Sequence, residues 1–307
     1  MQRADHLLLI GFGGPEKAEE VLPFLERLTQ GTRIPEARLK EVARHYELTG
    51  GFSPYNRHAR QLFGLLEREL RSSGLDLPLF LGMRNWRPFL SDAVREIAGK
   101  GLRRGLAIVL APHRSEASFD RYVKSVEAAV QEVGAPIEYG YLPAWYDHPL
   151  FIRAQAERAR PFFPSGPAVH LLFTAHSIPL EMARGSAYEA QIQTSGRLIA
   201  EALDADSWSV AYQSRSGPPG QPWLEPDVAA EVERLRSLGK RTVVAVPVGF
   251  LFDHTEVLYD LDVEARQATE GQGLRFLRAP TVMDHPQFIR MFADLIREHT
   301  AVQGAQR

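Results

Sequence analysis

The sequence predicts an α/β fold with two similar Rossmann-like domains, each a four-stranded parallel sheet flanked by helices. Three observations lead to this prediction. Apolar, β-branched runs alternate with amphipathic helical patterns, eight such runs are present, and a segment with two prolines, 142–149, divides them into four and four. Alternation of this kind is typical of parallel sheets with helices on both faces. The sequence shows no internal repeat, so the similarity of the halves is inferred from the number of elements.

The first half of the chain is expected to form an N-terminal domain of residues 1–145. Each of its strands is a short apolar run, and apolar residues at helical spacing follow it. The expected strands are 7–12, 78–83, 105–112 and 137–143, and the expected helices include 18–28, 55–72, 91–100 and 118–133. A helix expected at 286–300 is a candidate to pack back on this domain.

The second half is expected to form a C-terminal domain of residues 146–285. Its strands follow the same pattern and are bounded by glycine, proline and polar residues. The expected strands are 169–175, 209–213, 241–248 and 274–278, and the expected helices are 150–162, 188–203, 226–238 and 255–269.

The composition excludes several classes of protein. The 307 residues are 44% hydrophobic and 24% charged, which is ordinary for a globular protein. A net charge of −2 without a long basic cluster argues against nucleic acid as a partner. The absence of cysteine excludes disulfides and cysteine-ligated iron–sulfur clusters. Because no apolar run approaches the length of a membrane span, about 18 residues, and no signal peptide is recognised, we expect a cytoplasmic protein without a membrane segment.

Residues 246–264 pass from the seventh expected strand into a helix with three acids. Glu256, Asp260 and Glu264 are spaced i, i+4 and i+8, so they are expected on one face of the helix. Acids stacked in this way repel each other, and a cation would offset the repulsion. Two structural alternatives remain open: Asp253 and Glu256 as helix cap and capping-box partner, or a solvated acidic face.

A single histidine follows the fifth expected strand. In open parallel sheets, ligands bind beyond the carboxyl ends of the strands, which is where His176 lies. An imidazole beside carboxylates takes up protons near pH 7 and also ligates divalent metals, although a hydrogen-bonded structural role is the alternative. The sequence contains neither HExxH nor GxSxG, and the glycines at 11–14 lack the GxGxxG order. These residues indicate an enzyme that handles a metal or a proton in a partly apolar cleft.

Five motifs, in the same order and with matching spacing from residue 7 to 295, resemble the ferrochelatases. They are Gly13-Gly14-Pro15, Tyr46 through Gly50-Gly51-Phe52-Ser53-Pro54, Thr174-Ala175-His176-Ser177-Ile178-Pro179, Tyr212-Gln213-Ser214-Arg215 with Pro222-Trp223-Leu224-Glu225-Pro226, and Pro247-Val248-Gly249-Phe250 with Asp253-His254-Thr255-Glu256-Val257-Leu258-Tyr259-Asp260. The resemblance implies two similar four-stranded domains and a lyase of haem biosynthesis that inserts Fe²⁺ into a porphyrin held in the cleft between them.

The resemblance also implies roles for the acids and the histidine. His176 matches the family's invariant histidine and Glu256 its facing glutamate, so these two are the expected catalytic pair. As metal ligands we expect His176, Glu256, Asp260 and Glu264, the last two as an acidic row that hands metal inward or carries protons out. The partners are then Fe²⁺ and the porphyrin, with no further cofactor, and we expect a monomer.

Four residues are expected at the substrate. Phe12 occupies a position where relatives often carry a tyrosine that faces the metal, and a phenylalanine there can pack on the ring but cannot ligate iron. Arg44, Ser53 and Tyr122 match positions that contact propionates in the branch that uses coproporphyrin, with ordinary surface polarity as the alternative. Residues 83–86 depart from the histidine-containing version of that branch.

The substrate itself has more than one candidate. Coproporphyrin III, with four propionates, is favoured by the compact length and by Pro112-His113, and protoporphyrin IX, with two, is the alternative. A chelatase for another metal or tetrapyrrole, and a non-catalytic porphyrin or haem carrier, come after these two. A carrier would be expected to lack His176 or Glu256, and both are present.

Overall fold

A computed structural model describes residues 4–31, 35–164, 166–217 and 220–302 and confirms the predicted fold class. Its two sheets are all-parallel, with the strand orders β2-β1-β3-β4 and β6-β5-β7-β8. Within each sheet, the strand that comes first in the chain lies between the second and the third. The chain divides into two compact units with one sheet each: Met1–Leu110, Phe119–Pro143 and Phe288–Arg307 form the first, and Ala111–Ser118 and Ala144–Gln287 form the second.

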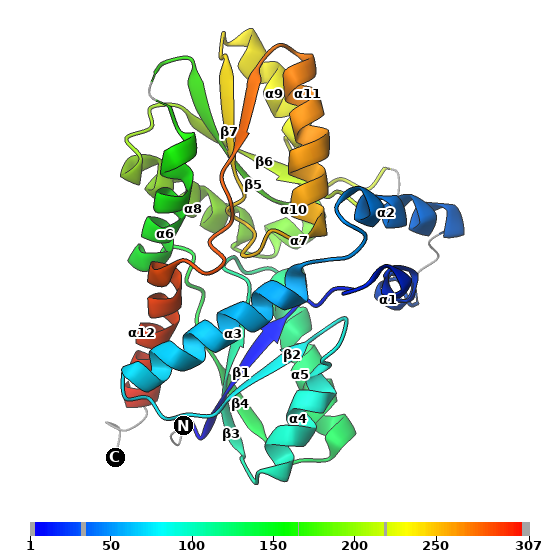
Figure 1. The fold of residues 1–307 in the computed structure, drawn as a ribbon, viewed down its shortest axis with the longest axis vertical. Coiled ribbons are helices and arrows are strands. Elements are labelled where there is room, and N and C mark those ends of the chain that lie inside the picture. Colours follow the sequence, from blue (N-terminus) through cyan, green and yellow to red (C-terminus); the bar gives the residue numbers. More distant parts are fainter. Residues whose placement is uncertain (1–3, 32–34, 165, 218–219, 303–307) are drawn as a thin grey trace. The chain divides into compact units, whose positions relative to one another are not determined.

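The first sheet is centred on a fully buried strand, β1 (His6–Gly11). Its neighbours are β2 (Leu79–Met83) and β3 (Arg104–Val109), and β4 (Glu138–Tyr141) pairs with β3. Strands that are covered on both faces need apolar residues at every position, which explains the continuous apolar runs in the sequence. The helices of this unit, labelled in Figure 1, are α1 (Val21–Leu28), α2 (Glu36–Leu48), α3 (Tyr55–Ser72), α4 (Leu90–Gly99), α5 (Arg121–Val133) and α12 (Pro286–Val302).

The second sheet repeats this arrangement around β5 (Val169–His176). β5 pairs with β6 (Trp208–Gln213) and β7 (Thr242–Val246), and β8 (Arg275–Arg278) pairs with β7. The helical elements of this unit are α6 (Pro149–Ala159), α7 (Leu180–Arg184), α8 (Tyr188–Ala202), α9 (Val228–Ser237), α10 (Thr255–Tyr259), the π-helical segment η4 (Asp260–Ala265) and α11 (Arg266–Gly271).

One hydrophobic core cluster packs the acidic segment, residues 255–265, against the second sheet. Val257 of α10 and Leu261 and Ala265 of η4 are buried in this cluster, together with residues of α9 and of β7 such as Val243. Burying an aliphatic side chain of this size stabilises the fold by roughly 1.5–3 kcal/mol. The apolar side of the acidic segment is therefore fixed against the sheet, as the sequence pattern predicts.

The observed elements differ from the expected ones mainly at their ends. The expected strands that contain Pro112, Pro143 and Pro247 end before these residues, because proline has no N–H to donate to a strand ladder. Two helices, α2 and α7, were not among those expected; α2 buries only Tyr46, so its apolar periodicity is weak. None of the described helices combines the length and the apolar character of a membrane span.

Candidate functional site

His176 is the last residue of β5, and its surroundings select the tautomer of its ring. Nδ1 lies 2.5 Å from the backbone oxygen of Ser177. A carbonyl oxygen can only accept, so Nδ1 carries a hydrogen, and the tautomer that this contact selects has its lone pair on Nε2. The hydroxyl of Tyr188 donates to the backbone oxygen of His176 at 3.0 Å, and burial raises the pKa of Tyr188, so this donor keeps its proton. The result is an oriented imidazole whose Nε2 has no hydrogen-bond partner in the described part of the chain.

The acids follow β7 in the order expected, but on two kinds of helix. Glu256 lies in α10, whereas Asp260 begins the π-helical segment η4, and Glu264 near its end is exposed. The pKa of Asp260 is raised to about 7, first by burial and then by the charges of Glu256 and Glu264. The row therefore runs from partly buried Glu256 and Asp260 to a solvent-exposed glutamate.

Asp260 is tied to the sheet by β6. In the strand register His176 of β5 lies opposite Gln213, and the Nε2 of Gln213 donates to Oδ2 of Asp260 at 3.2 Å. Ser214, whose backbone has φ of 61°, donates from its hydroxyl to the same oxygen. These hydrogen bonds lower the pKa of Asp260 against the effect of burial. Gln213 and Ser214 thus connect the strand beside His176 to the acidic row.

The loop that leads to α10 passes close to β5. The N–H of Gly249 donates to the oxygen of Thr174 at 3.0 Å. A Cβ at position 249 would lie 2.7 Å from Cβ and 2.8 Å from Cα of Ala175, the residue before His176. Only glycine fits this approach without displacing backbone.

The structure does not support the capping alternative for Asp253 and Glu256. The N-cap of α10 is His254, whose Nδ1 accepts from the N–H of Glu256 at 3.3 Å. Asp253 instead pairs with Arg278 at the end of β8. In the part of the chain that the structure describes, the Glu256 carboxylate has no hydrogen-bond partner, and no three His, Asp or Glu side chains are grouped so as to hold a metal ion.

In the first unit, Phe12 lies in the loop after β1 that α3 holds in place. The hydroxyl of Tyr55 accepts from the N–H of Phe12 at 2.8 Å, and Oδ1 of Asn56 accepts from that of Gly14 at 3.0 Å. The Phe12 ring packs on an aromatic cluster and lies 6.4 Å from the ring of Phe24, measured between centroids. This position is apolar and suits contact with a flat aromatic molecule.

The three predicted propionate contacts differ in exposure. Arg44 is exposed on α2, whereas Ser53 and Tyr122 are 6% and 8% exposed. Arg84, which the sequence reasoning did not select, places its guanidinium 5.7 Å from the centre of the Tyr122 ring. Ser53 packs against Gly14, where a Cβ would come within 2.9 Å of its hydroxyl oxygen. Within the described residues, no hydrogen bond joins Arg44, Ser53 and Tyr122 to one another.

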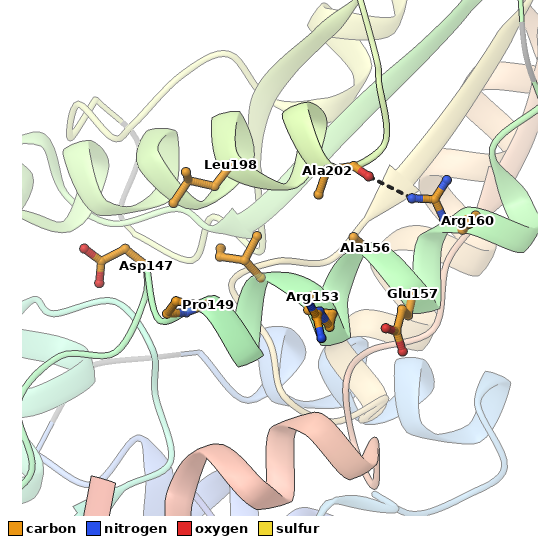
Figure 2. A pocket seen from close by; sticks show the side chains of 9 residues that line it. Asp147, Pro149, Arg153, Ala156, Glu157, Arg160, Leu198 and Ala202 are labelled. Atoms are coloured by element: carbon orange, nitrogen blue, oxygen red, sulfur yellow. Dashed lines mark hydrogen bonds between the residues drawn. The ribbon is translucent and has the colours of Figure 1, made fainter. Parts of the chain in front are cut away.

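A separate groove of about 490 Å³ lies between α6 and α8 (Figure 2). Its walls are mainly apolar, with charged side chains at the rim. Nine residues line it: Asp147, Pro149, Ile152, Arg153, Ala156, Glu157, Arg160, Leu198 and Ala202. None of the predicted site residues is among them.

Comparison with known proteins identifies close relatives over nearly the whole chain. The ferrochelatase family model matches residues 4–300. The chain is 40% identical to a ferrochelatase of Rhodopirellula baltica over 96% of its own length and 86% of the relative. It is 40% identical to the coproporphyrin III ferrochelatase of Nocardia farcinica (95% and 87%) and 41% identical to that of Mycobacteroides abscessus (96% and 88%).

Solved structures with the same fold are more distant. The sirohydrochlorin chelatase SirB of Bacillus subtilis subspecies spizizenii, in complex with cobalt, has a TM-score of 0.60 at 12% identity and covers 100% of this chain and 98% of that one. CbiX, described as the terminal enzyme of sirohaem biosynthesis in denitrifying bacteria, has a TM-score of 0.51 at 15% identity, with coverages of 95% and 98%. At these identities the likeness concerns the fold.

Proposed function

The chain belongs to the ferrochelatase family, and from this we propose that it inserts Fe²⁺ into coproporphyrin III in haem biosynthesis. The reaction replaces two pyrrole N–H protons by one divalent cation, so two protons leave for each metal that enters. The protein must therefore provide a proton acceptor beside the macrocycle, ligands that replace the water of the ion, and a route for the protons. The residues described above can fill these three roles.

The observation that carries the proposal is the Nε2 of His176, which has no hydrogen-bond partner among the residues that the structure describes. Because Nδ1 is held by the oxygen of Ser177, Nε2 is the atom that can accept a pyrrole proton or ligate the arriving metal. Glu256, which lacks a hydrogen-bond partner among the described residues, is the proposed partner of this base and a ligand of Fe²⁺. Carboxylate and imidazole ligands suit Fe²⁺.

Asp260 and Glu264 are proposed to pass metal or protons between this pair and solvent. A carboxyl with a pKa of about 7 is a poised proton carrier at neutral pH, since its protonated and ionised forms are both populated. Glu264 is exposed and completes the path outward. The three acids together also attract a divalent cation, which offsets their mutual repulsion.

The choice of coproporphyrin III is supported by the names of the N. farcinica and M. abscessus relatives. We propose that Phe12 packs on the macrocycle and that Arg44, Ser53 and Tyr122 bind propionates by charge or hydroxyl hydrogen bonds. We further propose a cytoplasmic monomer that needs no cofactor besides its substrate Fe²⁺. The absence of cysteine supports the last point, because no cysteine-ligated cluster can form.

The test is anaerobic Fe²⁺ insertion with coproporphyrin III and with protoporphyrin IX. Insertion converts the four-band spectrum of the free base to that of the metallated ring, whereas a carrier binds porphyrin without this change. We expect a preference for the tetracarboxylate, and a fall in kcat of about 100-fold or more in His176→Ala, since general-base catalysis contributes about 10²–10⁴-fold.

A second histidine supplies the matched control. His299 of α12 is also partly buried, and its Nδ1 lies 2.8 Å from the backbone oxygen of Leu295, so the same tautomer is selected. His299→Ala should retain activity. Equal activity of His176→Ala and wild type would refute the assignment of the base, and a preference for protoporphyrin IX would refute the choice of substrate.

A further inference from the structure

Arg278 connects the loop before the acidic row to Asp262, which lies between Asp260 and Glu264. It is the last residue of β8, and its Nη1 lies 2.9 Å from Oδ1 of Asp253, in the loop before α10. Its Nε and Nη2 lie 2.7 and 2.8 Å from the two carboxylate oxygens of Asp262, inside η4. A bidentate hydrogen-bonded pair of guanidinium and carboxylate fixes orientation as well as distance. One side chain thus holds the chain before Glu256 and after Asp260.

This pairing is more enclosed than the other ion pair of Asp262. The Arg278 side chain is 12% exposed, whereas Arg266, which approaches Asp262 at 3.7 Å, is 39% exposed. Exposed pairs contribute little because solvent screens them and the side chains lose entropy. A guanidinium enclosed between two carboxylates is held far more firmly, since separating them would leave charges without partners in a poorly solvated place.

The segment after Arg278 strengthens the attachment of the loop. The N–H of Thr281 donates to Oδ1 of Asp253 at 3.4 Å, and the N–H of Met283 donates to the oxygen of Leu251 at 3.0 Å. The loop 251–253 is therefore held from β8 by side-chain and backbone hydrogen bonds. At the other end, the π-helical segment that contains Asp262 is a rare geometry, which the surrounding structure must maintain.

Arg278 also neutralises two acids beside the row. Asp253 and Asp262 both lie within a few residues of Glu256 and Asp260, and the guanidinium contacts Oδ1 of Asp253 and both carboxylate oxygens of Asp262. Without Arg278, five acids would crowd residues 253–264. A divalent cation would then meet two further carboxylates that the guanidinium no longer holds, with Asp262 keeping only the exposed Arg266 at 3.7 Å.

We infer that Arg278 is a positioning residue, which fixes Glu256 and Asp260 for Fe²⁺ and keeps Asp253 and Asp262 from competing for it. The inference rests on the proposed function. It assigns Arg278 a role in the use of metal and none in the binding of porphyrin, so the two substrates should respond differently to its loss.

The experiment compares wild type, Arg278→Lys, Asp262→Asn and the control Arg266→Gln in anaerobic Fe²⁺ insertion. Lysine keeps the charge but cannot form the bidentate contact with Asp262. Asparagine at position 262 has only one acceptor oxygen, so it also prevents the bidentate contact. We expect kcat/KM for Fe²⁺ to fall by about 10–100-fold in both Arg278→Lys and Asp262→Asn, as is usual when residues that orient metal ligands are changed. In Arg278→Lys and Asp262→Asn, the Kd for coproporphyrin, measured by fluorescence quenching, should stay within about twofold of wild type. The control Arg266→Gln should likewise keep its insertion activity within about twofold of wild type.

Thermal unfolding accompanies each assay so that an unfolded variant is recognised. If wild type inserts Fe²⁺ and a folded Arg278→Lys or Asp262→Asn has unchanged kcat/KM for the metal, the inference is wrong while the proposed function stands. An equal loss of metal use and porphyrin binding would also overturn it, because that pattern indicates general structural damage. If wild type itself inserts no Fe²⁺, the proposed function fails.

Discussion

At the scale of single residues, Gly249 is the position where one added carbon should do the most damage to the site. A Cβ there would meet Cα and Cβ of Ala175 at 2.8 and 2.7 Å, and the backbone of β5 cannot retreat without moving His176. We expect Gly249→Ala to destabilise the protein by about 1–3 kcal/mol, the usual cost of overpacking, and to lower kcat of insertion. Urea unfolding and the insertion assay measure the two effects.

Gly271, the last residue of α11, provides the comparison for this substitution. No atom lies within 4 Å of the place where its Cβ would stand, and its backbone is not left-handed. Gly271→Ala should therefore be neutral or stabilising by up to about 1 kcal/mol, because alanine loses less chain entropy on folding. Equal stability of the two variants would show that the close approach at 249 carries no strain.

The sequence located His176 and the acids because strand ends and helical spacing are local signals. It did not reveal what holds them. Asp253 has the right spacing for a helix cap, but Arg278, distant in sequence, competes for its carboxylate and leaves His254 as the cap. The tautomer of His176 likewise depends on the direction of one backbone oxygen, which no residue pattern encodes.

At the scale of elements, the acidic helix was expected to be one regular α-helix over 255–269. The structure divides it into α10, η4 and α11. The hydrophobic spacing of Val257, Leu261 and Ala265 fits a helix of either kind, so periodicity cannot detect the π-helical segment. The strand elements were easier to predict, because most of them, such as β1, β5 and β7, are compact apolar runs between turn residues.

The hydrogen bond between Gln213 of β6 and Asp260 leads to a prediction about the pH dependence of kcat. The Nε2 of Gln213 donates to Asp260, and a hydrogen bond to the ionised form lowers the pKa of that carboxyl. In Gln213→Ala this contribution is lost, so the pKa of Asp260 should rise above about 7. If ionised Asp260 accepts protons during turnover, the acid limb of the kcat–pH profile should move to higher pH. An unchanged acid limb in a folded variant would show that Asp260 does not govern it.

At the scale of the whole molecule, both sheets have the same strand order although the sequence contains no repeat. Sheet order depends on pairing between distant segments, so the number and type of strands could be predicted and the order could not. After the third strand of each sheet the two halves differ: the α10 and η4 segments that follow β7 carry the acids, whereas the segment between β3 and α5 contains His113.

His113 and His170 together make the fold sensitive to acid. Burial lowers the pKa of His113 to about 3 and that of His170 to about 4. Such groups stabilise the fold above the pKa of an unfolded histidine, near 6.5, and this stabilisation is lost as the pH falls through the folded values. Asp260 acts in the opposite direction, because its raised pKa disfavours the folded state as the pH rises from about 4 to 7.

The two histidines should outweigh the one aspartate. From these three groups alone, between pH 7 and pH 4, we expect the free energy of unfolding to fall by about 3 kcal/mol, at about 1.4 kcal/mol for each unit of pKa difference. Urea unfolding at pH 7, 5.5 and 4 tests this directly. His170 accepts or donates hydrogen bonds with Ser207 and Ser209 at 2.8 and 2.7 Å, so His170→Gln, which retains amide hydrogen bonding without the titration, should flatten the profile. A profile that stays equally steep in this variant would assign the acid sensitivity to other groups.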